Sequence, residues 1–166
     1  MTTLFHVTID TQLGYMRPVS DGANLIRLDW DQSRFSAPDN PDDVSRETSD
    51  QLIAYLCGSL KNFRLPVRAE GKSVAGHAWL EAMAWIPYGA VVTYAEFAAA
   101  AGKPGAPRAA ATACSSNPIP IIYPCHRVVR AGGALGNYGG GSNLNPKHPD
   151  NLGRKQALID LEQQFA

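Results

Sequence analysis

The stretch "TYAEFAAAAGKPGAPRAAATACSSNP", residues 93–118, determines how the second half of the chain folds. Thr93 begins a capping box of the form Thr-x-x-Glu, which opens an alanine-rich helix that stops at Gly102. Pro107 suits the first turn of a second helix, which must end by Asn117 because a proline follows. A helix, a short glycine-containing turn and a second helix together predict a helix-turn-helix.

Charge is distributed unevenly along the chain, although the net charge is zero. Residues 1–96 hold twelve of the fifteen acidic residues, and no Asp or Glu falls between Glu96 and Asp150. Five cations lie in that interval: Lys103, Arg108, Arg127, Arg130 and Lys147. A cationic surface attracts phosphates and lowers the pKa of a nearby thiol. The interval therefore indicates a nucleic-acid partner and an activated cysteine.

The same interval contains "PIPIIYPCHRVV", residues 118–129, in which Cys125 and His126 are adjacent. Neighbouring side chains of an extended strand point to opposite sides, so these two can cooperate only if the backbone bends sharply. A cysteine becomes a nucleophile when a base removes its proton and a third group orients that base. Glu162 shares the inner face of the expected last helix with Leu158, which predicts a Cys-His-Glu relay.

Two other chemistries use some of the same residues. A cysteine hydrolase needs the same thiol, imidazole and carboxylate. A metal site is the second alternative, but Cys114, Cys125, His126 and His148 have no recognised ligand spacing. We expect neither a metal nor a cofactor.

Length and composition limit the number of domains and the class of protein. A chain of 166 residues with 45% hydrophobic residues fits one domain, or one small domain beside a lobe. No segment approaches the roughly 18–20 apolar residues of a membrane span, and the N-terminus lacks the pattern of a secretion signal. Three cysteines, an odd number, then favour reduced thiols in a cytoplasm-like compartment.

The remaining elements follow from periodicity and turn signals. We expect an antiparallel strand meander over residues 4–30, a loop over 31–43, and helices over 44–57, 74–85 and 153–165. Cys57 is expected to be a buried structural thiol on the first of these helices. Val74 is expected on the inner face of the second.

Residues 86–141, from "IPYG" through "PCHRVV" to the glycine run, resemble the C-terminal domain of the O6-alkylguanine-DNA alkyltransferases. The resemblance resumes at "RKQALIDLE" in the last helix, and "PCHRVV" is the family signature. It implies an α+β fold with a strand-rich, ribonuclease H-like lobe over residues 1–72. A mostly helical domain with the helix-turn-helix would occupy residues 73–166.

The resemblance also implies the activity. Cys125 would accept an alkyl group from the O6 atom of guanine in double-stranded DNA, once per molecule, and O4-alkylthymine is a second substrate to consider. His126 would deprotonate Cys125 through a bridging water, and Glu162 would orient His126. Tyr94 would donate a proton to the departing guanine. The protein would act as a monomer, without a membrane, in the cytoplasm or nucleoid of a prokaryote or the nucleus of a eukaryote.

The resemblance implies further roles for residues at positions that match the family. Arg108 would fill the gap left by the flipped nucleotide, and Asn117 would brace the cysteine loop. At the DNA, the resemblance implies contacts from Thr93, Ala109 and Ser115 in addition to Arg108 and Asn117. Around the substrate, it implies Val128, Tyr138, Gly139 and Lys155. A lesion-binding relative that senses damage without repair lacks the acceptor cysteine, so Cys125 argues against that class.

The chain departs from the family at three places. Ala75-Gly76 replaces the usual Phe-Gln, which affects packing between the lobes, and Gly139 stands where Ser or Ala is common and would widen the pocket. The segment 142–153 is about ten residues longer than usual, and we expect it to decorate the surface.

Overall fold

A small antiparallel sheet forms the N-terminal part of this computed structural model, which describes residues 2–166. Its strands are β1 (Phe5–His6), β2 (Ile9–Thr11), β3 (Gly14–Ser20) and β4 (Leu25–Asp29). β3 is central and pairs antiparallel with each of the other three. The expected meander is present, but its first run is divided at Thr8, whose backbone N–H donates to the Asp39 carboxylate at 3.1 Å instead of to a strand.

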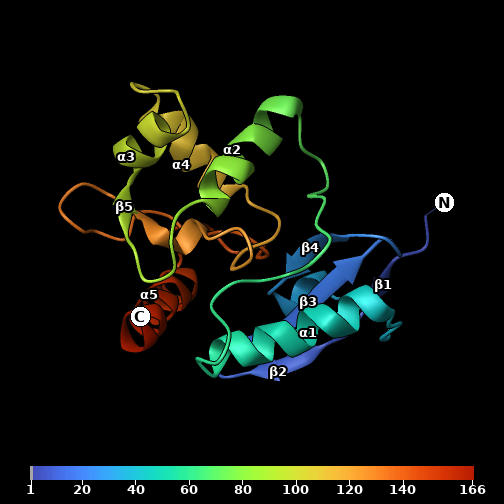
Figure 1. The fold of residues 1–166 in the computed structure, drawn as a ribbon. Helices are drawn as coiled ribbons and strands as arrows, with labels where there is room; N and C mark the ends of the chain where they lie inside the picture. Colours follow the sequence, from blue (N-terminus) through green and yellow to red (C-terminus); the bar gives the residue numbers. More distant parts are fainter. Residues whose placement is uncertain (1) are drawn as a thin grey trace.

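Helix α1 (Asp43–Leu56) packs on this sheet and contacts β1, β3 and β4 (Figure 1). Asp42 caps it by accepting from the Ser45 backbone N–H at 2.8 Å. The helix buries Leu52 and Tyr55. The expectation of a buried Cys57 is wrong: it lies one residue beyond the helix, at the C-cap, and is exposed.

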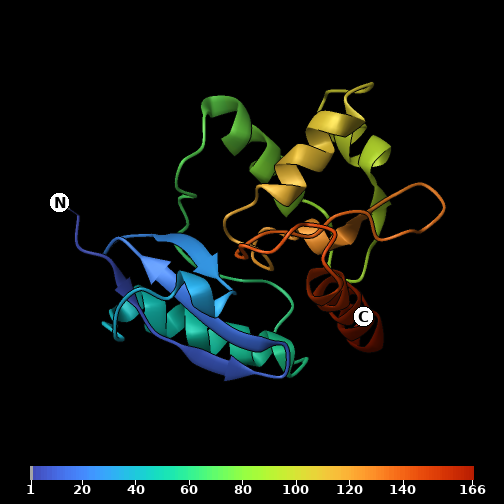
Figure 2. The same ribbon diagram turned by 180° about the vertical axis from the view of Figure 1, so that it is seen from behind.

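The remaining helices gather on the other side of a long connector, as both ribbon views show (Figures 1 and 2). The elements after α1 are α2 (Val74–Ala84), β5 (Val92–Thr93), α3 (Tyr94–Ala100), α4 (Pro107–Ser115), η2 (Cys125–Arg127), β6 (Val128–Val129) and α5 (Pro149–Phe165), and a short η1 (Gln32–Arg34) precedes α1. α3 packs against α4, and β5 pairs parallel with β6. The chain is thus a mixed α+β protein.

Local signals set the helix limits closely. The capping box is formed: Thr93 Oγ1 accepts from the Glu96 N–H at 3.1 Å, and Glu96 Oε1 accepts from the Thr93 N–H at 3.0 Å. α5, however, begins at Pro149 and not at residue 153, because His148 Nδ1 caps it by accepting from the Asp150 N–H. Val74 is 89% exposed, so its expected place on the inner face is wrong.

Strand β4 joins the two halves of the molecule. Along its outer edge the Leu25 N–H donates to the carbonyl of Pro66 in the connector at 2.8 Å. Further along, the Leu28 N–H donates to Pro118 O at 2.9 Å and the Trp30 N–H to Gly141 O at 2.7 Å. The edge of the sheet is therefore covered by the segments that flank η2.

One apolar cluster runs through both halves, from Met16 in β3 to Leu158 in α5. Trp30 at the end of β4 packs edge-on against Tyr138, with ring centroids 6.1 Å apart. The loop behind η2 is thereby packed against the sheet. Within residues 2–166, no helix is both long and apolar enough to cross a membrane.

Candidate active site

The backbone bends at Cys125 and His126, as their adjacency requires. Pro124 precedes a single 3₁₀ turn, in which the Arg127 N–H donates to Pro124 O at 3.0 Å. The chain then becomes extended at Val128 and enters β6. Side chains of neighbouring residues in such a turn do not point to opposite sides, as they would in a strand. The thiol of Cys125 and the imidazole of His126 therefore belong to the same short turn.

Asn117 holds the loop that leads into this turn. Its side-chain amide donates to Tyr123 O at 2.8 Å, and its Oδ1 accepts from the Ile119 N–H at 3.0 Å. Within the loop Ile121 has φ of 74°, a conformation that a β-branched residue rarely adopts. Such strain costs on the order of 1–3 kcal/mol and persists where the surroundings impose it, commonly near active sites.

The Cys125 sulfur is buried, with 1% of the residue exposed. Asn117 Nδ2 approaches Sγ at 3.3 Å as a donor. Burial raises the pKa of Cys125, and the hydrogen bond from Asn117 and the charge of Lys155 offset only part of that shift. The expected low pKa is therefore wrong for the resting protein. The thiol keeps its proton and needs a base.

His126 is placed to be that base. Its Nε2 lies 2.7 Å from Glu162 Oε2, and since a carboxylate only accepts, Nε2 carries the proton. The other nitrogen, Nδ1, is buried and has no hydrogen-bond partner among residues 2–166. Burial lowers the pKa of His126 even though Glu162 acts in the opposite direction. The imidazole is neutral, with a free lone pair.

Glu162 accepts hydrogen bonds from three other segments of the chain. Tyr55 OH of α1 donates to Oε2 at 2.6 Å, and the Arg127 guanidinium donates to both oxygens at 2.8 and 2.9 Å. The Gly89 N–H of "IPYG" donates to Oε1 at 3.1 Å. Burial alone would raise the pKa of Glu162, but these hydrogen bonds outweigh it and hold the pKa well below its usual value.

Tyr55 and Arg127 are site residues that were not singled out from the sequence. Arg127 was grouped with the surface cations, but it is 8% exposed and paired with Glu162, so it offers no charge to solvent. Its place inside "PCHRVV" was the available signal. Tyr55 looked like one more apolar residue of its helix, and only the contact between α1 and α5 shows its role.

Tyr94 is the first residue of α3. Its OH accepts from the Asn137 N–H at 3.3 Å, and burial raises its pKa. Lys155 of α5 is fully buried, donates to the carbonyls of Leu135 and Asn137, and has Nζ 5.7 Å from the Tyr94 ring centroid. Lys155 therefore fixes the backbone of the segment that faces Tyr94.

Gly139 does not widen the pocket, contrary to expectation. A Cβ built on it would lie 3.0 Å from Pro146 Cγ and 3.2 Å from Ser115 O, so the space is already filled. The Tyr138 N–H also donates to Pro146 O at 2.8 Å. Pro146, in the long segment 142–153, thus occupies the space that a side chain at position 139 would fill.

The residues expected at the DNA separate into two groups. Arg108 and Ala109 are exposed near the start of α4, and Thr93 and Ser115 are half-buried. Asn117 is 1% exposed, and its amide is used on the cysteine loop. The bracing role fits this geometry, but its expected place at the DNA is wrong. Val128 and Tyr138 are buried beside the turn, and Cys114 is a buried packing residue of α4.

Lys72 compensates for the departure at Ala75-Gly76. A Cβ on Gly76 would lie 3.2 Å from Lys72 Cδ, so the glycine makes room for the lysine side chain. Lys72 Nζ then donates to Ser116 O at 2.8 Å, at the end of α4. The connector is held to α4 by this contact.

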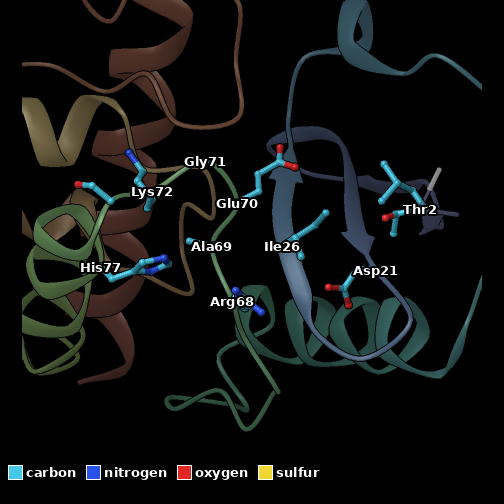
Figure 3. A pocket seen from close by; sticks show the side chains of 11 residues that line it. Thr2, Asp21, Ile26, Arg68, Ala69, Glu70, Gly71, Lys72 and His77 are labelled. Carbon is cyan, nitrogen blue, oxygen red and sulfur yellow. The ribbon is translucent and has the colours of Figure 1, made fainter.

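A cavity of about 670 Å³ lies between the hairpin of β3 and β4 and the start of α2 (Figure 3). Arg68 and Lys72 face it together with Asp21 and Glu70, so neither sign of charge prevails. It contains no cysteine. Among residues 2–166 no three His, Cys, Asp or Glu side chains cluster as a metal site. The reactive group of the molecule remains Cys125.

Comparison with known proteins agrees with this geometry. Residues 76–164 match the family model of the 6-O-methylguanine DNA methyltransferase DNA-binding domain. The methylated-DNA–protein-cysteine methyltransferase of Mycobacterium bovis is 37% identical over 96% of this chain and 92% of its own length. That of Methanosarcina acetivorans is 34% identical over 96% and 98%. The crystal structure of Mycobacterium tuberculosis OGT in complex with DNA superposes with a TM-score of 0.82 at 34% identity, covering 98% and 94% of the two chains.

A matched family model over half the chain and relatives above 30% identity along nearly all of it establish the family. The chain belongs to the methylated-DNA–protein-cysteine methyltransferases.

Proposed function

We propose that this protein repairs DNA by direct reversal, moving an alkyl group from guanine O6 in double-stranded DNA to the sulfur of Cys125. The observation that carries the proposal is the relay behind the thiol. His126 Nε2 lies 2.7 Å from Glu162 Oε2, while Nδ1, on the other side of the ring, has no hydrogen-bond partner among residues 2–166. A neutral imidazole so fixed is a general base for the adjacent thiol.

The transfer is a single displacement. The proton of Cys125 passes through a water molecule to His126 Nδ1, and the thiolate attacks the carbon bonded to O6. The S–C bond forms as the C–O6 bond breaks, and its electron pair stays on the guanine. Tyr94 donates its proton to the guanine, and the tyrosinate that remains regains a proton through solvent from the protonated His126, so both side chains end neutral. The thioether is stable and the site holds no group to cleave it, so each molecule reacts once.

Burial of Cys125 explains why the base must leave the helix. An O6-alkyl group within a duplex cannot reach a sulfur that is 1% exposed. The nucleotide has to be flipped out, at a cost of a few kcal/mol of unstacking. Arg108, exposed at the start of α4, is placed to enter the base stack and offset part of that cost.

We infer that α3, the turn after it and α4 form a helix-turn-helix, and that α4 enters the minor groove. Ala109 and Ser115 on α4 and Thr93 at the start of α3 are small residues suited to close approach. Val128, Tyr138, Gly139 and Lys155 would shape the guanine site. The division at residue 72 is supported by the cap of α2 at Ser73, and the strand lobe would be ribonuclease H-like.

The same site is proposed to accept O4-alkylthymine. The protein would work as a monomer on the DNA of the cytoplasm or nucleoid, or of the nucleus in a eukaryote.

Mass spectrometry after incubation with a duplex containing O6-methylguanine tests the function. We expect one added methyl group per protein, on Cys125, also in the Cys114→Ser variant, and none in Cys125→Ser. Repeated turnover would instead indicate a hydrolase. Label confined to Cys114 would refute the assignment of the acceptor.

A further inference from the structure

A second cavity, of about 520 Å³, opens beside Tyr94 and α4. Its lining residues are Tyr94, Ala111, Arg130, Ala134, Gly136, Asn137, Lys147 and Leu152. Within residues 2–166, Arg130 and Lys147 are the only charged lining residues of this cavity, and both are exposed. A cavity mouth with two cations and no carboxylate has a positive potential.

Lys147 comes from the long segment, which is attached to the body of the protein. Pro146 of this segment fills the space at Gly139, and its carbonyl accepts from the Tyr138 N–H. Asn151 of α5 donates to Asn145 O at 3.1 Å, and Asn145 Oδ1 accepts from the Lys147 N–H at 2.9 Å. The segment is thus a fixed wall that presents Lys147. This contradicts the expectation that it only decorates the surface.

Arg130 lines the same cavity from a different segment of the chain. It follows β6 directly, in a turn closed by its own N–H donating to Ala134 O at 2.8 Å and by Gly133 N–H donating to Arg130 O at 3.0 Å. The turn therefore begins at Arg130, four residues after His126. Arg130 is positioned by the same strand that positions the site.

Neither cation is neutralised within the protein. Four other arginines are paired with carboxylates, namely Arg17, Arg27, Arg34 and Arg127. Arg130 and Lys147 form no ion pair with any of residues 2–166. Two cations that line one cavity and lack a carboxylate partner are suited to an anionic ligand at its mouth.

We propose that Lys147 and Arg130 form a phosphate-binding pair, which holds the backbone of the DNA strand whose modified nucleotide enters the site. The inference rests on the proposed function, because Tyr94 and the α4 residue Ala111 line the same cavity. A strand that delivers its base past α4 passes between the two cations. Contacts of this kind position the strand and read no sequence.

The test measures duplex affinity against salt in the unreactive Cys125→Ser background. Lys147→Gln and Arg130→Gln should each weaken affinity roughly three- to fivefold at 0.1 M salt and reduce the slope of log Kd on log salt by about 0.9. Arg46→Gln, an exposed arginine of α1 on the strand lobe, is the matched control and should change neither quantity.

A second arm separates this proposal from the function on which it rests. With Cys125 restored, both variants should accept the benzyl group of free O6-benzylguanine at the unchanged rate while losing rate on duplex DNA. Unchanged duplex affinity and slope, with normal benzyl transfer, would overturn the phosphate pair alone. Absence of benzyl transfer to Cys125 in the unmodified protein would overturn the proposed function instead.

Discussion

Glu162 is the residue on which the geometry of the relay depends. One buried carboxylate accepts from Tyr55, His126, Arg127 and Gly89, residues that lie in three separate segments. Arg127 balances its charge, so burial of the anion is compensated. His126 therefore faces a carboxylate that keeps its negative charge and its position, and this fixes the ring with Nδ1 free.

Tyr55→Phe tests the contribution of the strand lobe to this relay. Removing a hydroxyl that donates to the carboxylate at 2.6 Å should lower the free energy of unfolding by about 1.5–3 kcal/mol, because hydrogen bonds to charged groups are the stronger ones. Alkyl transfer from free O6-benzylguanine should also slow. Urea unfolding and single-turnover kinetics provide the two measurements.

Tyr88→Phe is its matched control. The Tyr88 hydroxyl is buried and unpartnered among residues 2–166, so its loss should leave stability within about 0.5 kcal/mol or raise it. Equal effects of the two substitutions would show that Tyr55 acts only through packing.

The elements of the C-terminal half are each set by short-range signals. α3 begins at a capping box, α4 at Pro107, and Gly102 with φ of 76° stands between them. These signals depend on residues a few positions apart, so they could be interpreted without knowledge of the rest of the fold. The start of α5 was misplaced because His148 is an unusual cap.

Thr93→Ala tests how much the capping box contributes to α3. Loss of the hydroxyl that accepts from the Glu96 N–H should lower the free energy of unfolding by about 1 kcal/mol. Thr93→Ser retains the hydroxyl and should remain within a few tenths of a kcal/mol of the unmodified protein. Chemical unfolding of both variants gives the comparison, and an equal loss in both would assign the effect to the Thr93 methyl group.

At the scale of the whole molecule, the two halves meet along β4. Leu28 and Trp30 donate backbone hydrogen bonds to Pro118 and Gly141, which lie on either side of the cysteine turn. Tyr138 packs on Trp30 from the same side. The sheet therefore supports the segments on both sides of the cysteine turn.

Gly141→Ala should disrupt this junction. A Cβ at Gly141 would meet the backbone carbonyl of Leu28, which cannot move without breaking β4, and φ there is 75°. Gly102→Ala, with φ of 76° and nothing within 4 Å, should cost only the conformational strain of about 1–2 kcal/mol.

The difference in free energy of unfolding between the two glycine variants measures the steric cost of adding a methyl group where the two halves approach closely. We expect Gly141→Ala to lower the free energy of unfolding, measured in urea, by at least about 2 kcal/mol more than Gly102→Ala does. The reason is that a methyl group pressed against backbone atoms cannot be relieved by a side-chain movement. Similar losses of stability in the two variants would mean that the backbone at the junction can move to accept the methyl group, and that the two halves are not tightly packed there.

Much of the site was predictable from residues close together in the chain. The bend at Cys125, the pairing of His126 with Glu162 and the bracing by Asn117 all agree with what "PCHRVV" and the last helix implied. The high pKa of Cys125 was not predictable, because it comes from burial, which depends on what the rest of the chain places around the sulfur.

The sequence by itself determined the starts of α3 and α4, the sharp turn at the cysteine and the family, since caps, prolines, glycines and a contiguous signature act over a few residues. Tertiary structure alone decided that Tyr55 and Arg127 meet at Glu162, that Pro146 occupies the space at Gly139, and that Lys147 and Arg130 line one cavity. The physical reason is that these contacts join segments tens of residues apart, and packing of the whole chain determines which of them meet.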